Sequence, residues 1–169
     1  SLGVVSIAFG AYELAQKYAP TMIDDVAAFE NTAARNAVEI NLPEDALIVR
    51  DTKYVDESGH VDYPKYAPDN GFVAGTKHIE TLDVGALIDR YGGPGGDFTA
   101  PKGTPYKMRS LPYYKNQNVY HVYRVIKPIE NVEAGRIAPA FGEPGGGIQY
   151  KLPAPIEKLL GEYLEEVTQ

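Results

Sequence analysis

The stretch from Leu87 to Arg109, LIDRYGGPGGDFTAPKGTPYKMR, organises this chain, together with a second stretch from Ala138 to Leu152, APAFGEPGGGIQYKL. Each stretch contains a glycine-rich turn between apolar pieces that resemble strands. Glycine allows a backbone to turn tightly and to approach another backbone or a ligand closely. We therefore expect the two stretches to meet at one ligand-binding face.

The same stretches carry side chains that suit a charged ligand with flat rings. An arginine fork can grip phosphate oxygens with two parallel hydrogen bonds and always keeps its charge. Aromatic faces can stack on a flat ring, and an amide can orient water or a hydroxyl group without adding charge. Two arginines, three rings and one amide are present: Arg90, Arg109, Tyr91, Phe98, Tyr106 and Gln149. This combination favours a dinucleotide as the ligand.

Composition indicates a globular domain with a local, loop-rich site. The chain has 169 residues, of which 44% are hydrophobic, and its mean hydropathy is -0.28. This length is enough for one domain with a core, plus an appendage. Of the 17 glycines, ten lie between Gly92 and Gly147. The glycine excess is therefore typical of a ligand-binding loop region on an ordered scaffold.

Charge and residue types exclude several classes of function. The net charge of -7 argues against a nucleic-acid binder, which needs a basic face to displace counterions. The chain has no cysteine, which excludes disulfides, cysteine zinc sites and a thiol nucleophile. The apolar run at the start of the chain ends at Gly10, far short of a membrane span, so we expect no membrane insertion. His60 has no partner at metal-ligand spacing, and we expect no metal site.

Hydrophobic periodicity predicts an α+β fold with a compact, mainly antiparallel sheet. Residues Val119 to Ile126 alternate between two faces as a strand does, and Lys77–Leu82 and Ile148–Leu152 also have strand character. Pro155 opens a short helix that Gly161 can end, with Tyr163–Val167 returning as a last strand. A continuous helix through Leu164 is the alternative. We expect the glycine-rich turns to crowd on one edge of the sheet.

The N-terminal region has a different pattern. Apolar residues at helical spacing from Met22 to Val38 predict an amphipathic helix, with Thr21 as a plausible N-cap. A boundary follows at Asn41, and residues 50–70 form a long surface loop rich in turn signals. We therefore divide the chain into a helical N-terminal segment, residues 1–41, and a domain comprising residues 42–169.

The two glycine-rich stretches and their neighbours resemble the tuberculosis necrotizing toxin (TNT) family of NAD glycohydrolases. Their order and spacing agree over roughly the last hundred residues, beyond what a short motif would produce by chance. The N-terminal third takes no part. The matching pieces are Leu87-Ile-Asp-Arg-Tyr-Gly92, Gly96-Asp-Phe98, Ala100-Pro-Lys-Gly-Thr-Pro105, Arg109-Ser-Leu-Pro112, Tyr120-His-Val-Tyr-Arg-Val125, Ala138-Pro-Ala-Phe-Gly142 and Pro144-Gly-Gly-Gly-Ile-Gln-Tyr150.

The resemblance implies an enzyme that hydrolyses the nicotinamide-ribose bond of its substrate, NAD or NADP. It implies no cofactor and no metal. The leaving nicotinamide is a neutral heterocycle released from a cation, so it needs no protonation by a carboxylic acid. By the same resemblance, Arg90 and Gln149 match the family's activity residues, His121 its functional histidine, Phe98 or Tyr91 its ligand-facing rings, and Arg109 a second phosphate contact. From the residues alone, His121 also fits a neutral histidine within a sheet.

Two other functions stay open on the sequence. An ADP-ribosyltransferase would use the same substrate and would want a carboxylate to activate its acceptor, and Glu143 and Asp97 lie in the loops. A nucleotide-binding or interaction module without catalysis is the third possibility. The family also implies a secreted effector that carries this domain at its C-terminal end and acts in the cytosol of a target cell. A cognate immunity protein would then cover the loops between Gly92 and Gly147.

Overall fold

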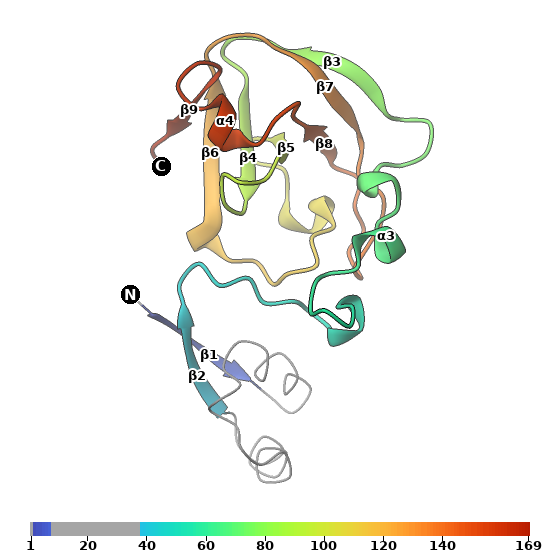
Figure 1. Ribbon diagram of the computed structural model, residues 1–169, viewed down its shortest axis with the longest axis vertical. Coiled ribbons are helices and arrows are strands. Elements are labelled where there is room, and N and C mark those ends of the chain that lie inside the picture. Colours follow the sequence, from blue (N-terminus) through green and yellow to red (C-terminus); the bar gives the residue numbers. More distant parts are fainter. Residues whose placement is uncertain (1, 8–37) are drawn as a thin grey trace. The chain divides into compact units, whose positions relative to one another are not determined.

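The structure, a computed structural model, describes residues 2–7 and 38–169 (Figure 1). The chain divides into two compact units. The first unit contains Ser1–Asp62 with Pro112–Tyr114, and the second contains Tyr63–Leu111 with Lys115–Gln169. Within the described residues, no helix has the length and apolar character needed to cross a membrane.

The first unit contains a two-stranded antiparallel sheet. Its strands are β1 (Leu2–Ile7) and β2 (Val38–Pro43), and it also holds a 3-10 helix, η3 (Thr52–Tyr54). The valines and isoleucine of β1 favour an extended backbone because branching at Cβ suits a pleated sheet. Residues 2–7 form a strand, whereas the rest of the helical segment that we predicted over residues 1–41 lies mostly outside the described residues and stays a prediction.

The predicted helix from Met22 to Val38 lies outside the described residues, except for Val38, which begins β2. The predicted boundary between residues 41 and 42 falls inside β2. That residues 42–169 form the functional domain stays a prediction.

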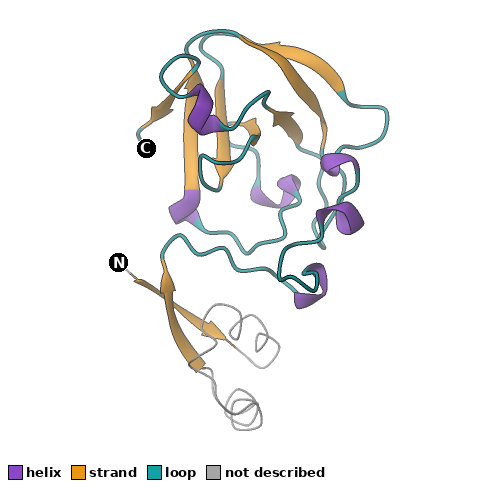
Figure 2. Cartoon of the chain, in the orientation of Figure 1, coloured by secondary structure: helices purple, strands orange, loops and turns teal. Residues whose placement is uncertain are grey.

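The second unit is built on a seven-stranded sheet in the order β3-β7-β8-β5-β4-β6-β9. All neighbouring strands in this sheet are antiparallel, which confirms the predicted fold class. Figure 2 shows that strands dominate this unit and that its helices are short. The strands are β3 (His78–Leu82), β4 (Leu87–Tyr91), β5 (Phe98–Pro101), β6 (Tyr120–Val125), β7 (Ile129–Arg136), β8 (Ile148–Lys151) and β9 (Leu164–Val167). The helices are α3 (Tyr63–Tyr66), η4 (Asp69–Gly71), η5 (Tyr106–Arg109), η6 (Gln117–Val119) and α4 (Ile156–Leu159).

One face of this sheet carries the hydrophobic core. Ile88, Tyr123 and Leu152 are almost completely buried there, and α4 packs Ile156 and Leu159 against them. Removing such branched and aromatic side chains from water is the main force that holds a small domain together. The opposite face of the sheet is therefore the one on which polar side chains can gather.

The C-terminal elements follow one of the two predicted arrangements. α4 ends before Gly161, which has a φ of 94°, a backbone conformation that favours glycine. The chain then turns back and Leu164–Val167 pairs with β6 as β9. The short helix followed by a strand is thus confirmed, and the continuous helix through Leu164 is wrong.

Candidate active site

Strand alternation divides the residues of the first glycine-rich stretch between two faces. Asp89 lies opposite Ala100, and Phe98 lies opposite Lys151, two residues from Gln149. Alternate residues of a strand share a face, and so do residues that lie opposite each other on neighbouring strands. Ile88 points into the core, so its neighbour Asp89 lies on the side away from the core, together with Phe98 and Gln149. We call this side the pocket face.

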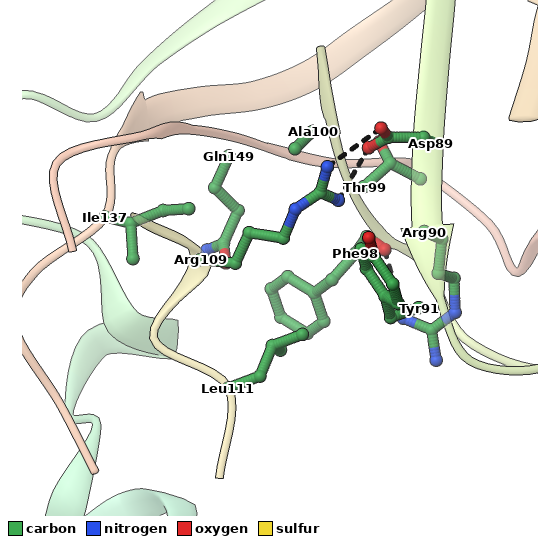
Figure 3. A pocket seen from close by; sticks show the side chains of 10 residues that line it. All are labelled: Asp89, Arg90, Tyr91, Phe98, Thr99, Ala100, Arg109, Leu111, Ile137 and Gln149. Carbon is green, nitrogen blue, oxygen red and sulfur yellow. Dashed lines mark hydrogen bonds and ion pairs between the residues drawn. The ribbon is translucent and has the colours of Figure 1, made fainter. Parts of the chain in front are cut away.

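A pocket opens on the pocket face (Figure 3). Its lining residues are Asp89, Arg90, Tyr91, Phe98, Thr99, Ala100, Arg109, Leu111, Ile137 and Gln149. The cavity volume is about 50 Å³, well below the ~300 Å³ of sites that enclose a whole drug-sized ligand. A dinucleotide could therefore place only one end inside. All of the predicted site residues except His121 and Tyr106 belong to this lining.

A buried ion pair between Asp89 and Arg109 forms one wall of the pocket. The Asp89 carboxylate is inaccessible to solvent, and the Arg109 side chain is only 5% exposed. Two guanidinium nitrogens of Arg109 donate to the two carboxylate oxygens, at 2.6 and 2.8 Å (Figure 3). The same carboxylate accepts from the Gly103 backbone N–H at 2.9 Å and from the Tyr120 hydroxyl at 2.7 Å. Such a fully hydrogen-bonded pair can remain charged inside a protein.

Arg109 has further contacts that fix its position. Its Nε and Nη2 donate to the Thr104 carbonyl at 2.9 and 2.7 Å, and its guanidinium lies 4.9 Å from the centre of the Tyr91 ring. Because these bonds occupy most of its donors, Arg109 ties η5 to β4. The phosphate contact that we predicted for Arg109 stays a prediction. The hydrogen bonds of Arg109 favour a role in holding η5 on β4.

Tyrosine side chains contact the ion pair of Asp89 and Arg109. The Tyr91 ring packs against Tyr106 and Tyr120, with centroid distances of 4.8 and 4.7 Å. Burial and the hydrogen bond to Asp89 raise the pKa of Tyr120 to about 12. Tyr120 therefore stays protonated near neutral pH and keeps donating to the carboxylate. Phe98, by comparison, lines the pocket as a ring without a polar tip.

The first glycine loop, Gly92–Asp97, is folded around the Arg90 side chain. Arg90 Nε donates to the Gly93 carbonyl at 2.9 Å, and Nη1 donates to the Phe98 carbonyl at 3.0 Å. A Cβ atom added at Gly96 would overlap the end of the Arg90 side chain, so the guanidinium would have to move. Glycine at position 96 leaves space for the guanidinium in its present place.

The second glycine loop, Pro144–Gly147, contacts the helix that carries Arg109. Gly147 N–H donates to the Met108 carbonyl at 3.1 Å, and a Cβ atom at Gly147 would lie 2.9 Å from the same oxygen. Gln149 follows this loop at the start of β8, and its Nε2 donates to the Asn70 carbonyl at 2.8 Å. This bond fixes the amide, so that its Oε1 is the atom with which Gln149 can accept a hydrogen bond.

His121 lies outside the pocket lining. It stands opposite Arg90 on β6, and its Nδ1 lies 2.6 Å from Glu166 Oε1 of β9. Its predicted functional role stays a prediction. The described part of the chain also contains no group of three or more histidine, cysteine, aspartate or glutamate side chains placed to hold a metal ion.

Our reading of the sequence gave no role to Asp89, Thr104 or Tyr120. Asp89 left one usable signal, because it is a charged residue within the otherwise apolar start of the strand Leu87-Ile-Asp. A carboxylate at such a place is rarely buried unless it is paired. Its partner Arg109 lies twenty positions away, and nothing in the local pattern identifies it.

The curled antiparallel sheet and its pocket define a small enzyme-like domain, and comparison with known proteins identifies its family. The family described as Tuberculosis necrotizing toxin matches residues 81–167, more than half of the chain. The chain therefore belongs to the tuberculosis necrotizing toxin family.

Individual relatives agree with this assignment. The conidial surface nicotinamide adenine dinucleotide glycohydrolase nadA of Aspergillus fumigatus is 43% identical over 50% of this chain and 41% of its own length. The outer membrane channel protein CpnT of Mycobacterium tuberculosis is 32% identical over 53% of this chain and 12% of its own. The chain thus spans less than half the length of these relatives.

A solved structure, tuberculosis necrotizing toxin complexed with its immunity factor IFT, has a similar fold. It superposes with a TM-score of 0.51 at 28% identity, covering 66% of this chain and 65% of that chain. About two thirds of this chain therefore has a fold similar to that of this toxin.

The buried ion pair predicts a large effect of a small substitution. Asp89→Asn keeps the shape of the side chain but leaves the Arg109 charge buried without a counter-charge. We expect the free energy of unfolding to fall by about 3 to 5 kcal/mol in urea denaturation. The matched control is Glu165→Gln, which breaks the exposed ion pair with Arg124 and should cost less than about 1 kcal/mol. Equal losses in the two variants would contradict the structural role of the buried pair.

Proposed function

We propose that this chain is an NAD(P) glycohydrolase module that hydrolyses the nicotinamide-ribose bond and releases nicotinamide and ADP-ribose. Membership of the toxin family and the 43% identity with a nicotinamide adenine dinucleotide glycohydrolase support this function. The observation that carries it is the pocket, where Gln149, Phe98 and Arg90 share one lining. No cofactor other than the substrate is needed for this chemistry.

The reaction places modest demands on the protein. As the bond from ribose C1′ to the nicotinamide nitrogen breaks, its electron pair passes to the ring, which becomes neutral. Water adds to C1′ and loses one proton to solvent. The leaving group needs no acid, in contrast to the paired carboxylic acids of ordinary glycosidases. The protein has to hold the two ends of the substrate, stabilise the sugar cation and position a water.

Gln149 is suited to the reacting end of the pocket. Its amide nitrogen is fixed by the Asn70 carbonyl, so Oε1 can accept a hydrogen bond from the attacking water or from a ribose hydroxyl. A fixed dipole directed at the site of developing positive charge stabilises a transition state more than a ground state. Gln149 thereby acts on the chemical step.

The remaining lining residues serve in binding. Phe98 offers its ring for stacking on nicotinamide, whereas the Tyr91 ring is held between Tyr106 and Tyr120 and supports the wall. Arg90, at the edge of the pocket, supplies a permanent positive charge for the substrate phosphates. Its Nε and Nη1 donate to the Gly93 and Phe98 carbonyls, and these bonds orient the guanidinium.

The carboxylates favour hydrolysis over transfer of ADP-ribose to a protein. Asp89 is the one carboxylate in the described lining, and Arg109, Gly103 and Tyr120 all donate to it. Asp97 and Glu143 both lie outside the lining. An acceptor on another protein would therefore find no available base in the pocket, whereas water needs none.

The biological setting is part of the proposal. The related tuberculosis necrotizing toxin forms a complex with its immunity factor. For this chain we propose a cognate immunity protein that covers the glycine loops between Gly92 and Gly147 and excludes the substrate. The module would belong to a secreted effector and would deplete NAD in the cytosol of a target cell.

The activity itself is tested by incubating the purified protein with NAD alone. Nicotinamide and ADP-ribose should appear in equal amounts, with no protein acceptor present, because water is the only co-reactant. Pre-treatment with a chelator followed by dialysis should leave the rate unchanged. Products that appear only when an acceptor protein is added would indicate a transferase. Absence of turnover with both NAD and NADP would refute the proposed function.

Gln149 should influence the chemical step. Because Gln149 would act on the developing ribosyl cation, Gln149→Ala should lower kcat by on the order of a hundredfold and change KM little. Thermal melting should remain native, since the side chain is partly exposed in the pocket. Unchanged kcat in a folded Gln149→Ala protein would remove this residue from the catalytic site.

Arg90 should influence binding, and the glycine loop offers a second way to test it. Arg90→Ala should raise KM by about tenfold or more, the loss expected for a charged hydrogen bond. Gly96→Ala should reproduce much of this effect, because the added Cβ would displace the guanidinium while Gly96 itself has an ordinary backbone conformation. Gly95→Ala is the matched control, since a Cβ there meets nothing within 4 Å. An equal KM in Gly95→Ala and Gly96→Ala would argue against this arrangement.

A further inference from the structure

We infer that Lys151 is a second phosphate-binding residue of the site, and that Asp97 holds its ammonium group in place until a substrate phosphate replaces the carboxylate. The inference rests on the proposed function and specifies where the phosphate end of the substrate lies. It arises from the register of β8 and β5 together with the charges on the pocket face.

Lys151 is positioned beside the catalytic end of the pocket. On β8 it follows Gln149 by two residues, so their side chains share a face and their Cα atoms lie about 7 Å apart. Across the sheet it lies directly opposite Phe98 of β5. Lys151 is therefore next to both the proposed stacking ring and the proposed catalytic amide, just outside the lining.

The size of the cavity requires a binding surface beyond it. A volume of about 50 Å³ admits one end of a dinucleotide, and the reacting nicotinamide end is the one that has to reach Gln149. The phosphates are one sugar ring further along the substrate. They must then lie on the pocket face close to the rim, where Lys151 is situated.

The other cations near the pocket leave room for this role. The charge of Arg109 is balanced by Asp89 at 2.6 Å within the protein. Arg90 donates to the Phe98 backbone carbonyl from β4, and Lys151 lies opposite Phe98 on β8. Lys151 thus adds a second cation near Phe98, and a pyrophosphate carries two negative charges. A lysine reaches such a group with a flexible stem and three rotatable donors.

The partner of Lys151 is suited to exchange. Lys151 Nζ lies 3.4 Å from Asp97 Oδ2, a looser contact than that of Arg109 with Asp89. Both side chains are partly exposed, at 31% and 27%, so water and salt weaken their attraction. Asp97 belongs to the first glycine loop, where its charge would also repel an arriving phosphate. The two residues should therefore affect binding in opposite directions.

The test compares steady-state kinetics of Lys151→Gln, Lys151→Arg and Asp97→Asn with those of the wild-type protein. Lys151→Gln should raise KM for NAD about tenfold with little change in kcat, and Lys151→Arg should restore most of the loss. Asp97→Asn should lower KM by about threefold because it removes a competing and repelling charge. ADP-ribose should inhibit Lys151→Gln about tenfold less strongly than wild type, whereas inhibition by nicotinamide should stay the same.

The matched control is Lys127→Gln, which removes a lysine charge from an ion pair with Glu162 in the turn between β6 and β7. It should leave KM unchanged. If wild type hydrolyses NAD but Lys151→Gln retains its KM and its ADP-ribose inhibition, the inference is wrong while the proposed function stands. A raised KM in Asp97→Asn, or equal loss of inhibition by ADP-ribose and nicotinamide, would also overturn it. Failure of the wild type to hydrolyse NAD concerns the proposed function alone.

Discussion

The pocket depends on one buried ion pair, Asp89 with Arg109. Taking two charges out of water is costly, and the cost is recovered only when geometry is good and the other lone pairs and protons are satisfied. Gly103, Tyr120 and the Thr104 carbonyl supply those additional bonds. The pair consequently fastens η5 onto β4. The second glycine loop, whose Gly147 N–H donates to the Met108 carbonyl of η5, is linked to the pair in this way.

The glycine content of the two loops follows from what occupies the places of their missing side chains. At Gly96 the space is filled by the Arg90 guanidinium, and at Gly147 by the Met108 carbonyl. The first loop is also held to α4, where Ile156 N–H donates to the Gly96 carbonyl at 3.1 Å. Both loops are thus shaped by contacts within the protein, although a glycine-rich sequence alone would equally suggest a loop that surrounds a ligand.

The sequence allowed the fold class and half of the lining residues to be predicted, and the failures have local causes. β6 and β8 were predictable from their strand-like patterns. β7 was missed because it does not alternate regularly: Ile129 and Val132 are both buried although they are three residues apart. Asn131, with a φ of 59°, lies between them, and the register with β3 shifts nearby. Arg109 was interpreted as a ligand contact because its carboxylate partner lies on β4, twenty residues earlier in the chain, and periodicity carries no information about such a pair.

The chemical character of the two ends of the proposed site differs, and this difference explains how a domain without an available acid could act on NAD. At the reacting end the lining presents neutral groups, Gln149 and Phe98, while its one carboxylate is neutralised by Arg109. At the rim lie the cations Arg90 and Lys151. In this proposal, the substrate phosphates contribute binding energy at a distance from the nicotinamide-ribose bond that breaks. In the proposed reaction, the fixed Gln149 amide dipole acts where charge develops. Interactions that strengthen in the transition state raise kcat, whereas uniform binding lowers KM. This separation suffices for a substrate such as NAD, because its leaving group departs as a neutral molecule and needs no acid.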